Sequence, residues 1–198
     1  MDKTASLSCV LHNGRDYTTP SYPCHPAAKR RSVHALGMRV LGFDPGTATT
    51  GYGVVEGKGS RLSHVAHGTI VTSPDPHFAH RLKLIFEKAQ ELIALYKPDA
   101  VAIEKIYFSQ NVTTGISVAQ ARGALAVAAA LAEKPVVEFS PLEVKNAVVG
   151  YGKATKKQVQ EMVKILLNLD APPKPDDAAD ALALAICQIH SGRLTNSP

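Results

Sequence analysis

The feature that most constrains the fold of this chain is a short apolar run, Arg39–Phe43, which stops at Asp44 and is followed at once by Pro45 and Gly46. An apolar run bounded by a turn signal is typical of a buried strand, so Asp44 is expected where that strand ends. In an open α/β sheet, the carboxyl ends of central strands border the crevice in which ligands bind. The alternative is that Asp44 only caps the turn, accepting hydrogen bonds from the amides of Gly46 and Thr47.

The length allows one sizeable core, since 198 residues are too few for two full α/β domains. No apolar run approaches the ~20 residues that a membrane span requires, and the first residues show no signal-peptide pattern. Cys9, Cys24 and Cys187 are widely spaced and form neither a metal-ligand nor a disulfide pattern. We therefore expect a cytoplasmic protein without a membrane segment, a disulfide framework or a zinc site.

Residues 1–37 lack a sustained apolar period and carry the basic cluster Lys29–Arg31. This composition predicts a disordered extension, in which the cluster is either a solvated charge run or a contact to nucleic acid. Because Met38 directly precedes the first strand, the alternative is that the extension is not native, which N-terminal sequencing would decide. The extension holds five basic and two acidic residues, which leaves 17 basic against 15 acidic from Met38 onward. The net charge of +5 is thus weak evidence for a nucleic-acid partner.

Two further strands are predicted directly after the Asp44 turn. They span residues 50–55 and 61–71 and are separated by Gly57-Lys58-Gly59, a hairpin signal. Three strands joined by short turns should form an antiparallel meander.

A helix with an apolar period over residues 82–96 follows, with Asp75 as a candidate N-cap and Lys97-Pro98 as its stop. The fourth predicted strand, residues 100–104, again ends on a carboxylate, Glu104. The chain thus repeats the pattern of an apolar strand that stops at an acid.

Residues 116–134 predict an Ala-rich helix after a polar loop. Its small side chains form one face, which suits either tight packing on the sheet, the interpretation we favour, or a helix across a dimer interface. The residues of this small-residue face are Ala119, Gly123, Ala126 and Ala130.

Residues 135–139 predict a fifth strand, and three helices are expected after it. Two capping boxes, Ser140 with Glu143 and Thr155 with Gln158, predict helices that begin at residues 141 and 156. The last helix is expected from about residue 177 to 189.

The element order predicts an α/β fold with a five-stranded mixed sheet, three antiparallel strands and then two parallel ones, flanked by helices. A strand–helix–strand crossover makes the later strands parallel, so Asp44 and Glu104 should face each other at the sheet edge. We expect one domain over residues 38–190 and a flexible C-terminal tail over 191–198.

Two more acids, Asp177 and Asp180, open the last helix at a spacing that puts them on one face. The neighbouring Asp176 is better explained by the helix dipole. Four converging carboxylates without a basic neighbour in sequence raise each other's pKa values or need a counter-ion. Mg²⁺ meets that need, and two such ions can clamp the attacking and leaving oxygens of a phosphoryl displacement.

Several separated motifs between Met38 and His190 resemble the RuvC family of Holliday junction resolvases. These motifs are Asp44-Pro-Gly-Thr with Gly51-Tyr-Gly-Val, Ala102-Ile-Glu104, Gln120-Ala-Arg-Gly, Val144-Lys145 to Gly150, and Asp177-Ala-Ala-Asp180-Ala-Leu-Ala. The resemblance implies an RNase H-like fold, a homodimer, and metal-dependent endonuclease cleavage of four-way DNA junctions in recombination and repair. It also implies two Mg²⁺ ions per site, with Mn²⁺ able to substitute, and RuvA and RuvB branch-migration proteins as partners.

Carried over by motif, Asp44, Glu104, Asp177 and Asp180 match the catalytic, metal-binding acids of the family. Some members have His at the third position, so Asp177 keeps this set all-carboxylate. The extension over residues 1–37 has no family counterpart.

Candidate DNA contacts are the lysines of residues 145–164 and an aromatic residue after Glu104. Phosphate contacts by lysine give affinity that fades with salt, while each lysine could equally be a solvated surface charge. Lys145 and Lys156 match lysines of the family's DNA-binding surface, and Tyr107 matches its aromatic position, although its ring could instead plug the core edge. The predicted DNA contacts are Lys145, Lys156, Tyr107, Lys153 and Lys157.

Two other functional classes stay open at this point. An actin-like phosphotransferase or ATPase also opens with a strand and an Asp-Gly-Thr-like loop, but needs a second domain that this length cannot hold. A catalytically inactive junction-binding module would keep the lysines and lose acids, whereas all four acids are present. Junction nicking with and without Mg²⁺, together with nucleotide hydrolysis, separates the three classes.

Overall fold

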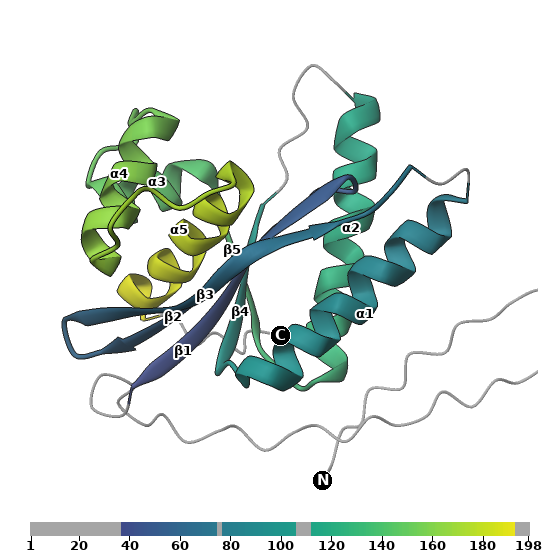
Figure 1. Cartoon of the computed structure of the whole chain (residues 1–198), viewed down its shortest axis with the longest axis horizontal. Coiled ribbons are helices and arrows are strands. Elements are labelled where there is room, and N and C mark those ends of the chain that lie inside the picture. The colour runs from purple at the N-terminus through teal and green to yellow at the C-terminus, as the bar shows by residue number, and fades with distance from the viewer. Residues whose placement is uncertain (1–36, 75–76, 106–111, 193–198) are drawn as a thin grey trace, which may run out of the picture. The chain divides into compact units, whose positions relative to one another are not determined.

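The computed structural model of the chain describes residues 37–74, 77–105 and 112–192. A five-stranded sheet in the order β3-β2-β1-β4-β5 forms its centre (Figure 1). The strands are β1 (Met38–Asp44), β2 (Thr49–Lys58), β3 (Arg61–Val71), β4 (Ala100–Glu104) and β5 (Val136–Phe139). The helices are α1 (Phe78–Tyr96), α2 (Val112–Leu131), α3 (Pro141–Val149), α4 (Lys156–Leu167) and α5 (Asp176–Ser191).

The sheet confirms the predicted mixed topology. β1 pairs antiparallel with β2 and β2 with β3, while β4 runs parallel to β1 and to β5. The register of β1 on β4 sets Phe43 opposite Ile103. The next residues along the two strands are Asp44 and Glu104, so both carboxylates lie at the carboxyl ends of neighbouring strands, at the same end of the sheet.

Both faces of the sheet are covered, because side chains of central strands alternate between two apolar clusters. Leu41 and Phe43 of β1 pack with α1 and α2 on one face. Val40 packs with α3, α4 and α5 on the other. Figure 1 shows the two groups of helices on opposite sides of the sheet.

Helix α5 lies unusually close to the sheet because glycines face it. A side chain at Gly42 would collide with the carbonyl of Ala181, and one at Gly51 with the carbonyl of Asp177. The helix contributes alanines at the contact, so two small surfaces meet backbone to backbone. This packing fixes the first turn of α5 beside the ends of β1 and β2.

Both predicted capping boxes are confirmed. Ser140 accepts a hydrogen bond from the Glu143 amide at the start of α3, and Thr155 accepts one from the Gln158 amide at the start of α4. In each case the side chain at the third position bonds back to the amide of the cap residue. The two helices begin at residues 141 and 156, as the sequence predicts.

Two predictions about helix ends are wrong. Helix α1 has His77 at its N-cap, where Asp75 was predicted, and Asp75 itself lies outside the described residues. Helix α2 begins at Val112 and ends at Leu131, not at residues 116 and 134. The segment Thr113-Thr114-Gly115 has low helix propensity, which is a weak guide when the rest of a helix packs well.

The small-residue face of α2 is divided between the core and the surface, so the favoured interpretation, packing on the sheet, holds only in part. Ala126 packs against the apolar cluster that includes Leu41 and Phe43. The buried face of this helix is formed by Ala121, Leu125, Ala128 and Ala129. Ala130 is exposed, and a side chain at Gly123 would meet no described atom within 4 Å. Gly123 and Ala130 thus stay open to the alternative, a helix across a dimer interface.

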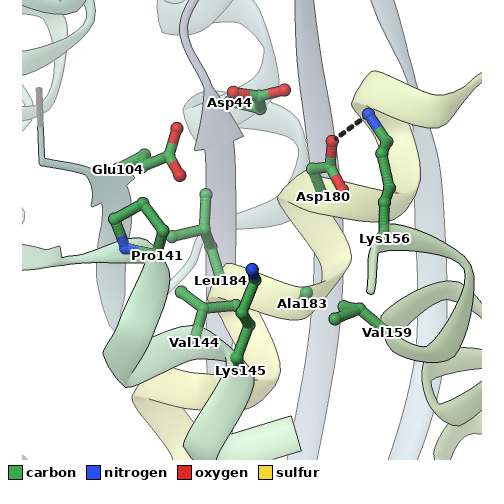
Figure 2. A pocket seen from close by; sticks show the side chains of 10 residues that line it. All are labelled: Asp44, Glu104, Pro141, Val144, Lys145, Lys156, Val159, Asp180, Ala183 and Leu184. Carbon is green, nitrogen blue, oxygen red and sulfur yellow. Dashed lines mark ion pairs between the residues drawn. The ribbon is translucent and has the colours of Figure 1, made fainter. Parts of the chain in front are cut away.

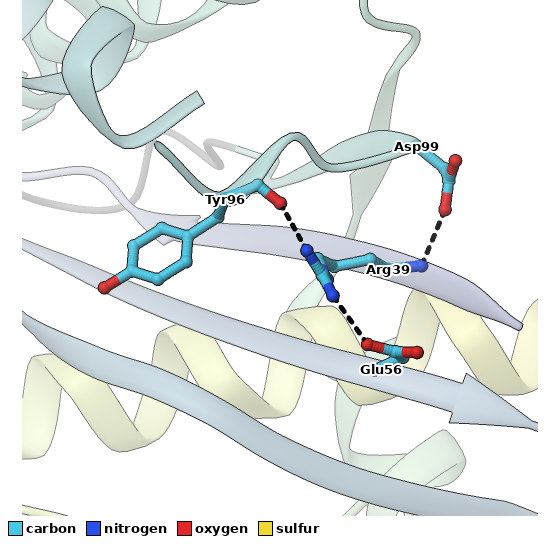
Figure 3. A network of polar contacts seen from close by, with 4 residues as sticks. All are labelled: Arg39, Glu56, Tyr96 and Asp99. Carbon is cyan, nitrogen blue, oxygen red and sulfur yellow. Dashed lines mark hydrogen bonds and ion pairs between the residues drawn. The ribbon is translucent and has the colours of Figure 1, made fainter. Parts of the chain in front are cut away.

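The end of the sheet opposite the two acids is fixed by Arg39 (Figure 3). Its guanidinium donates to the Tyr96 carbonyl and to Glu56, each at 2.8 Å, and its amide donates to Asp99 at 2.7 Å. These bonds join β1, β2 and the segment after α1, so the start of β4 is held beside β1.

The predicted domain ends can be followed only in part. Within the predicted extension over residues 1–37, the structure describes Gly37 alone, and of the tail over 191–198 it describes Ser191, which ends α5, and Gly192, which caps it. Over the described ranges, every helix is too short or too polar to cross a membrane.

Candidate active site

The turn after Asp44 is held from three sides. Thr50 donates its hydroxyl to the Gly46 carbonyl at 2.7 Å. The Thr47 carbonyl accepts bonds from the hydroxyl of Thr72 and from the guanidinium of Arg81 on α1, the latter at 2.8 Å. The capping alternative required the side chain of Asp44 to close this turn. Among the described residues, the side chain that closes it is that of Thr50. The Asp44 carboxylate is left to face the crevice.

A pocket of about 190 Å³ opens at this edge of the sheet, between the starts of α3, α4 and α5. Its acids come from three elements: Asp44 from β1, Glu104 from β4 and Asp180 from α5 (Figure 2). Two lysines also line it, Lys145 from α3 and Lys156 from α4. The lining residues are Asp44, Glu104, Pro141, Val144, Lys145, Lys156, Val159, Asp180, Ala183 and Leu184.

Lys156 is the positive charge in closest contact with the acids. Its ammonium lies 2.8 Å from Asp180 and 4.0 Å from the exposed Asp176. Burial works to lower the pKa of Lys156, but the hydrogen bond that Lys156 donates to Asp180 and the charges of Asp180, Asp176 and Asp44 raise it above the ordinary value. Lys156 is therefore held as a cation.

Asp44 shows the strongest electrostatic effect. Its pKa is raised to about 8, chiefly by burial and further by the charges of Glu104, Asp180 and Asp177, while Lys156 acts against the rise. One ammonium therefore does not balance the acids around Asp44.

Glu104 and Asp180 are shifted in the same direction. Burial raises the pKa of Glu104, with a further contribution from Asp180. Burial also raises the pKa of Asp180, against the opposing effect of its bond to Lys156. Three carboxyl groups in one pocket thus resist ionisation, and an added cation would relieve all of them.

Asp177 lies one turn before Asp180 on α5 but does not line the pocket. Its charge still raises the pKa values of Asp44 and Asp180, so it lies within electrostatic reach of both. Asp176 points elsewhere: it is hydrogen-bonded to Lys174 at 3.2 Å, which lowers its pKa. The structure thus brings three of the four predicted acids into one pocket and sets the fourth beside it.

The fit of a metal ion follows from the donors and their charges. Among the described residues, no three Asp, Glu, His or Cys side chains form a ready metal-binding group. The donor chemistry nevertheless suits Mg²⁺, which prefers a few carboxylate oxygens with water completing its shell. Burial and like charges raise the pKa of Asp44, and a bound cation would oppose both effects. Asp44, Glu104 and Asp180, with Asp177 beside them, would hold such an ion.

The predicted DNA-contact residues fall into three groups. Lys145 and Lys156 line the pocket. Lys153 and Lys157 are exposed near the start of α4. Tyr107 lies outside the described residues.

Sequence reasoning missed the apolar floor of the pocket and the support behind it. Val144, Val159 and Leu184 form part of the floor and belong to the apolar periods of α3, α4 and α5. Arg81 supports the Asp44 turn from α1, and its distance of 34 residues from Thr47 gave no local signal. One signal in the sequence could have helped. Glycines in β1 and β2 allow another backbone to approach closely, and no conclusion was drawn from them.

Comparison with known proteins gives a consistent picture. The family model described as crossover junction endodeoxyribonuclease RuvC matches residues 40–188. A crossover junction endodeoxyribonuclease RuvC from Alkaliphilus metalliredigens is 54% identical over 155 residues, which cover 78% of this chain and 94% of that relative.

Solved structures agree with the family match. RuvC of T. thermophilus, in complex with a Holliday junction substrate, superposes with a TM-score of 0.75 at 35% identity and covers 79% of this chain and 96% of its own. The yeast mitochondrial Holliday junction resolvase superposes with a TM-score of 0.57 at 16% identity, covering 77% of this chain and 79% of its own, which is a likeness of fold.

Proposed function

The chain belongs to the RuvC family of crossover junction endodeoxyribonucleases, and on this premise we propose that it resolves four-way DNA junctions by hydrolysing phosphodiester bonds at the acidic pocket. The observation that carries the assignment is that Asp44, Glu104 and Asp180, from three separate elements, line one pocket, where burial and the neighbouring acids raise the pKa of Asp44 to about 8. A site with this excess of negative charge is suited to a cation and, through the cation, to a phosphate. Recombination and repair are the processes that produce such junctions, and the cytoplasm is where this protein would meet them.

We propose Mg²⁺ as the cation, two ions per site, with Asp44, Glu104, Asp177 and Asp180 as ligands and Mn²⁺ as a possible substitute. When bound, the metal supplies positive charge that stabilises the charge developing on the phosphate and the leaving oxygen. Lys156 favours the ionised form of Asp180, against the effect of burial, and orients its carboxylate through their 2.8 Å ion pair. Lys145, which also lines the pocket (Figure 2), is available to a phosphate oxygen of the strand.

Homodimerisation is part of the proposal, because two cuts related by symmetry call for two sites related by symmetry. Helix α2 offers a surface for it. Ile116, Val127 and Leu131 are 50%, 53% and 65% exposed, and their spacings put them on one face together with Gly123. An apolar helix face of this kind is suited to the same face of a second copy. Cooperation with RuvA and RuvB is the further proposal that family membership supports.

The test compares a synthetic four-way junction with a linear duplex of the same arm sequences. We expect nicking of the junction in Mg²⁺, none in EDTA, and little cleavage of the duplex. Binding without nicking in any divalent ion would favour the inactive junction-binding module. Nucleotide hydrolysis without nicking would favour the actin-like phosphotransferase.

A further inference from the structure

Two large apolar side chains of α3 and of the segment that follows it are exposed. Leu142, in the first turn of α3, is 58% exposed, and Tyr151, directly after the cap residue Gly150, is 56% exposed. Neither contributes to the two apolar clusters of the core. Their exposure therefore has no explanation in the folding of the chain itself.

The two side chains belong to one region of the surface, because the segment after α3 folds back along that helix. A side chain at Gly152 would collide with the end of Leu142 and would lie 3.0 Å from the side-chain oxygen of Asn146. The Tyr151 carbonyl accepts a hydrogen bond from the Ala154 amide at 3.1 Å, which tightens the turn into α4. The ring of Tyr151 is thus carried on a short, ordered turn and not on a long loop.

The surroundings of this apolar region are basic. Lys145 lies three residues after Leu142, on the same side of α3, and lines the pocket. Lys153 is exposed two residues after Tyr151, and Lys156 begins α4. The acid of this stretch, Glu143, is used in the capping box of α3. An apolar surface framed by lysines complements a polyanion with flat apolar faces.

We propose that Leu142 and Tyr151 form a platform on which an unstacked base of the junction strand rests while the flanking lysines hold its phosphates. The proposal rests on the proposed function and adds a base contact to the phosphate contacts of the lysines. DNA bases stack on aromatic rings with little sequence preference, and near a branch point they are more easily unstacked than in a duplex. The hydroxyl end of Tyr151 can stay in water while the ring is covered.

The experiment measures junction affinity of the full chain in EDTA, so that binding is separated from cleavage, over a range of salt concentrations. A junction with 2-aminopurine at the branch point reports base stacking by its fluorescence. We expect Tyr151→Ala to weaken junction binding roughly 5- to 150-fold, at low and high salt alike, and to abolish the fluorescence change. Tyr151→Phe keeps the ring and should behave as wild type, and Leu142→Ala should give a smaller loss.

Lys153→Ala is the electrostatic control. It should reduce the slope of log affinity against log salt by about one, whereas Tyr151→Ala should leave the slope unchanged. The platform is refuted if Tyr151→Ala binds the junction like wild type, or if its loss fades with salt as that of the lysine variant does. If Tyr151→Ala binds like wild type, a protein partner would explain the exposed Leu142 and Tyr151 better than a base. Failure of the wild-type protein to prefer or nick junctions would instead refute the proposed function.

Discussion

At the scale of single residues, the partly buried carboxylates of the pocket outnumber the one ammonium that contacts them. Asp44, Glu104 and Asp180 all have raised pKa values, with burial as the largest cause in each. Lys156 opposes the rise but is shared between Asp180 and the exposed Asp176. The excess charge predicts how the protein responds to pH and to the loss of the lysine.

The stability of the metal-free protein should fall as the pH rises. The pKa of Asp44 is about 8 in the folded state against 3.8 as the ordinary value, so the stability contribution is complete below pH ~4 and is lost as the pH rises through ~8. The slope from this group is up to about 1.4 kcal/mol per pH unit, measured by urea unfolding in EDTA. Asp44→Asn should reduce the slope, and millimolar Mg²⁺ should stabilise the wild type more at high pH than at low pH. An unchanged slope in the Asn variant would contradict the burial of Asp44 among acids.

Lys156→Ala should weaken junction binding, and the loss should shrink at high salt, because phosphate contacts are screened. The salt slope of binding should drop by about one. Lys83→Ala is the matched control: it removes the same charge from α1, on the other face of the sheet, where Lys83 pairs with Glu87 at 3.6 Å. If both variants behave alike in binding and in cleavage, Lys156 is only a surface charge.

At the scale of elements, the site depends on how closely α5 lies on the sheet. Gly42 and Gly51 leave no room for a side chain beneath the helix backbone. The first two turns of α5 carry Asp177 and Asp180, so the same contact that packs the helix also positions the acids. The packing of α5 and the placement of the acids are therefore coupled at Gly51, where an added side chain would meet the backbone of Asp177.

Gly51→Ala should cost about 1–3 kcal/mol of stability and most of the cleavage activity, because the added methyl group must push the backbone at Asp177 away. Gly68→Ala on the neighbouring strand is the control, since there the added group meets only the ring of Tyr52, which can turn aside. Chemical denaturation and single-turnover nicking measure the two effects. Equal behaviour of the two variants would mean that α5 does not hold the acids in place.

Elements with local signals were predictable from the sequence. The strand 100–104 was placed at its observed bounds by its apolar run and its terminal acid, and α3 and α4 by their capping boxes. The start of α2 was misplaced, because Thr113-Thr114-Gly115 are weak helix formers whose conformation is set by the rest of the helix. Its small-residue face was assigned to the sheet as a whole, whereas Ala126 packs on the core and Ala130 is exposed, because periodicity alone does not distinguish a buried residue from an uncovered one.

The sequence predicted which acids belong to the site better than it predicted the contacts that hold them in place. Strand ends and helix spacing identified Asp44, Glu104 and Asp180, which line one pocket. The ion pair of Lys156 with Asp180 and the support of Thr47 by Arg81 join residues 24 and 34 positions apart. Such contacts depend on the packed fold and leave no pattern within a window of sequence.

At the scale of the whole molecule, the exposed face of α2 predicts self-association. Val127→Lys should shift the protein from dimer to monomer in sedimentation equilibrium, because a charge would replace an apolar group that is 53% exposed in the single chain. Ile165→Lys on α4 replaces an apolar group that is 66% exposed and should leave the oligomeric state unchanged. A wild-type protein that is monomeric at micromolar concentration would contradict the dimer.

The central claim is that acids from β1, β4 and α5 act together as one metal-dependent nuclease site. Single-turnover nicking of a four-way junction in Mg²⁺ by wild type and by Asp44→Asn tests it most directly, with junction affinity measured on the same samples. The account predicts that the variant loses cleavage by at least about 10³-fold while binding the junction as tightly or more tightly, since it loses a metal ligand and a negative charge that faces DNA. Cleavage at the wild-type rate by Asp44→Asn would contradict the account.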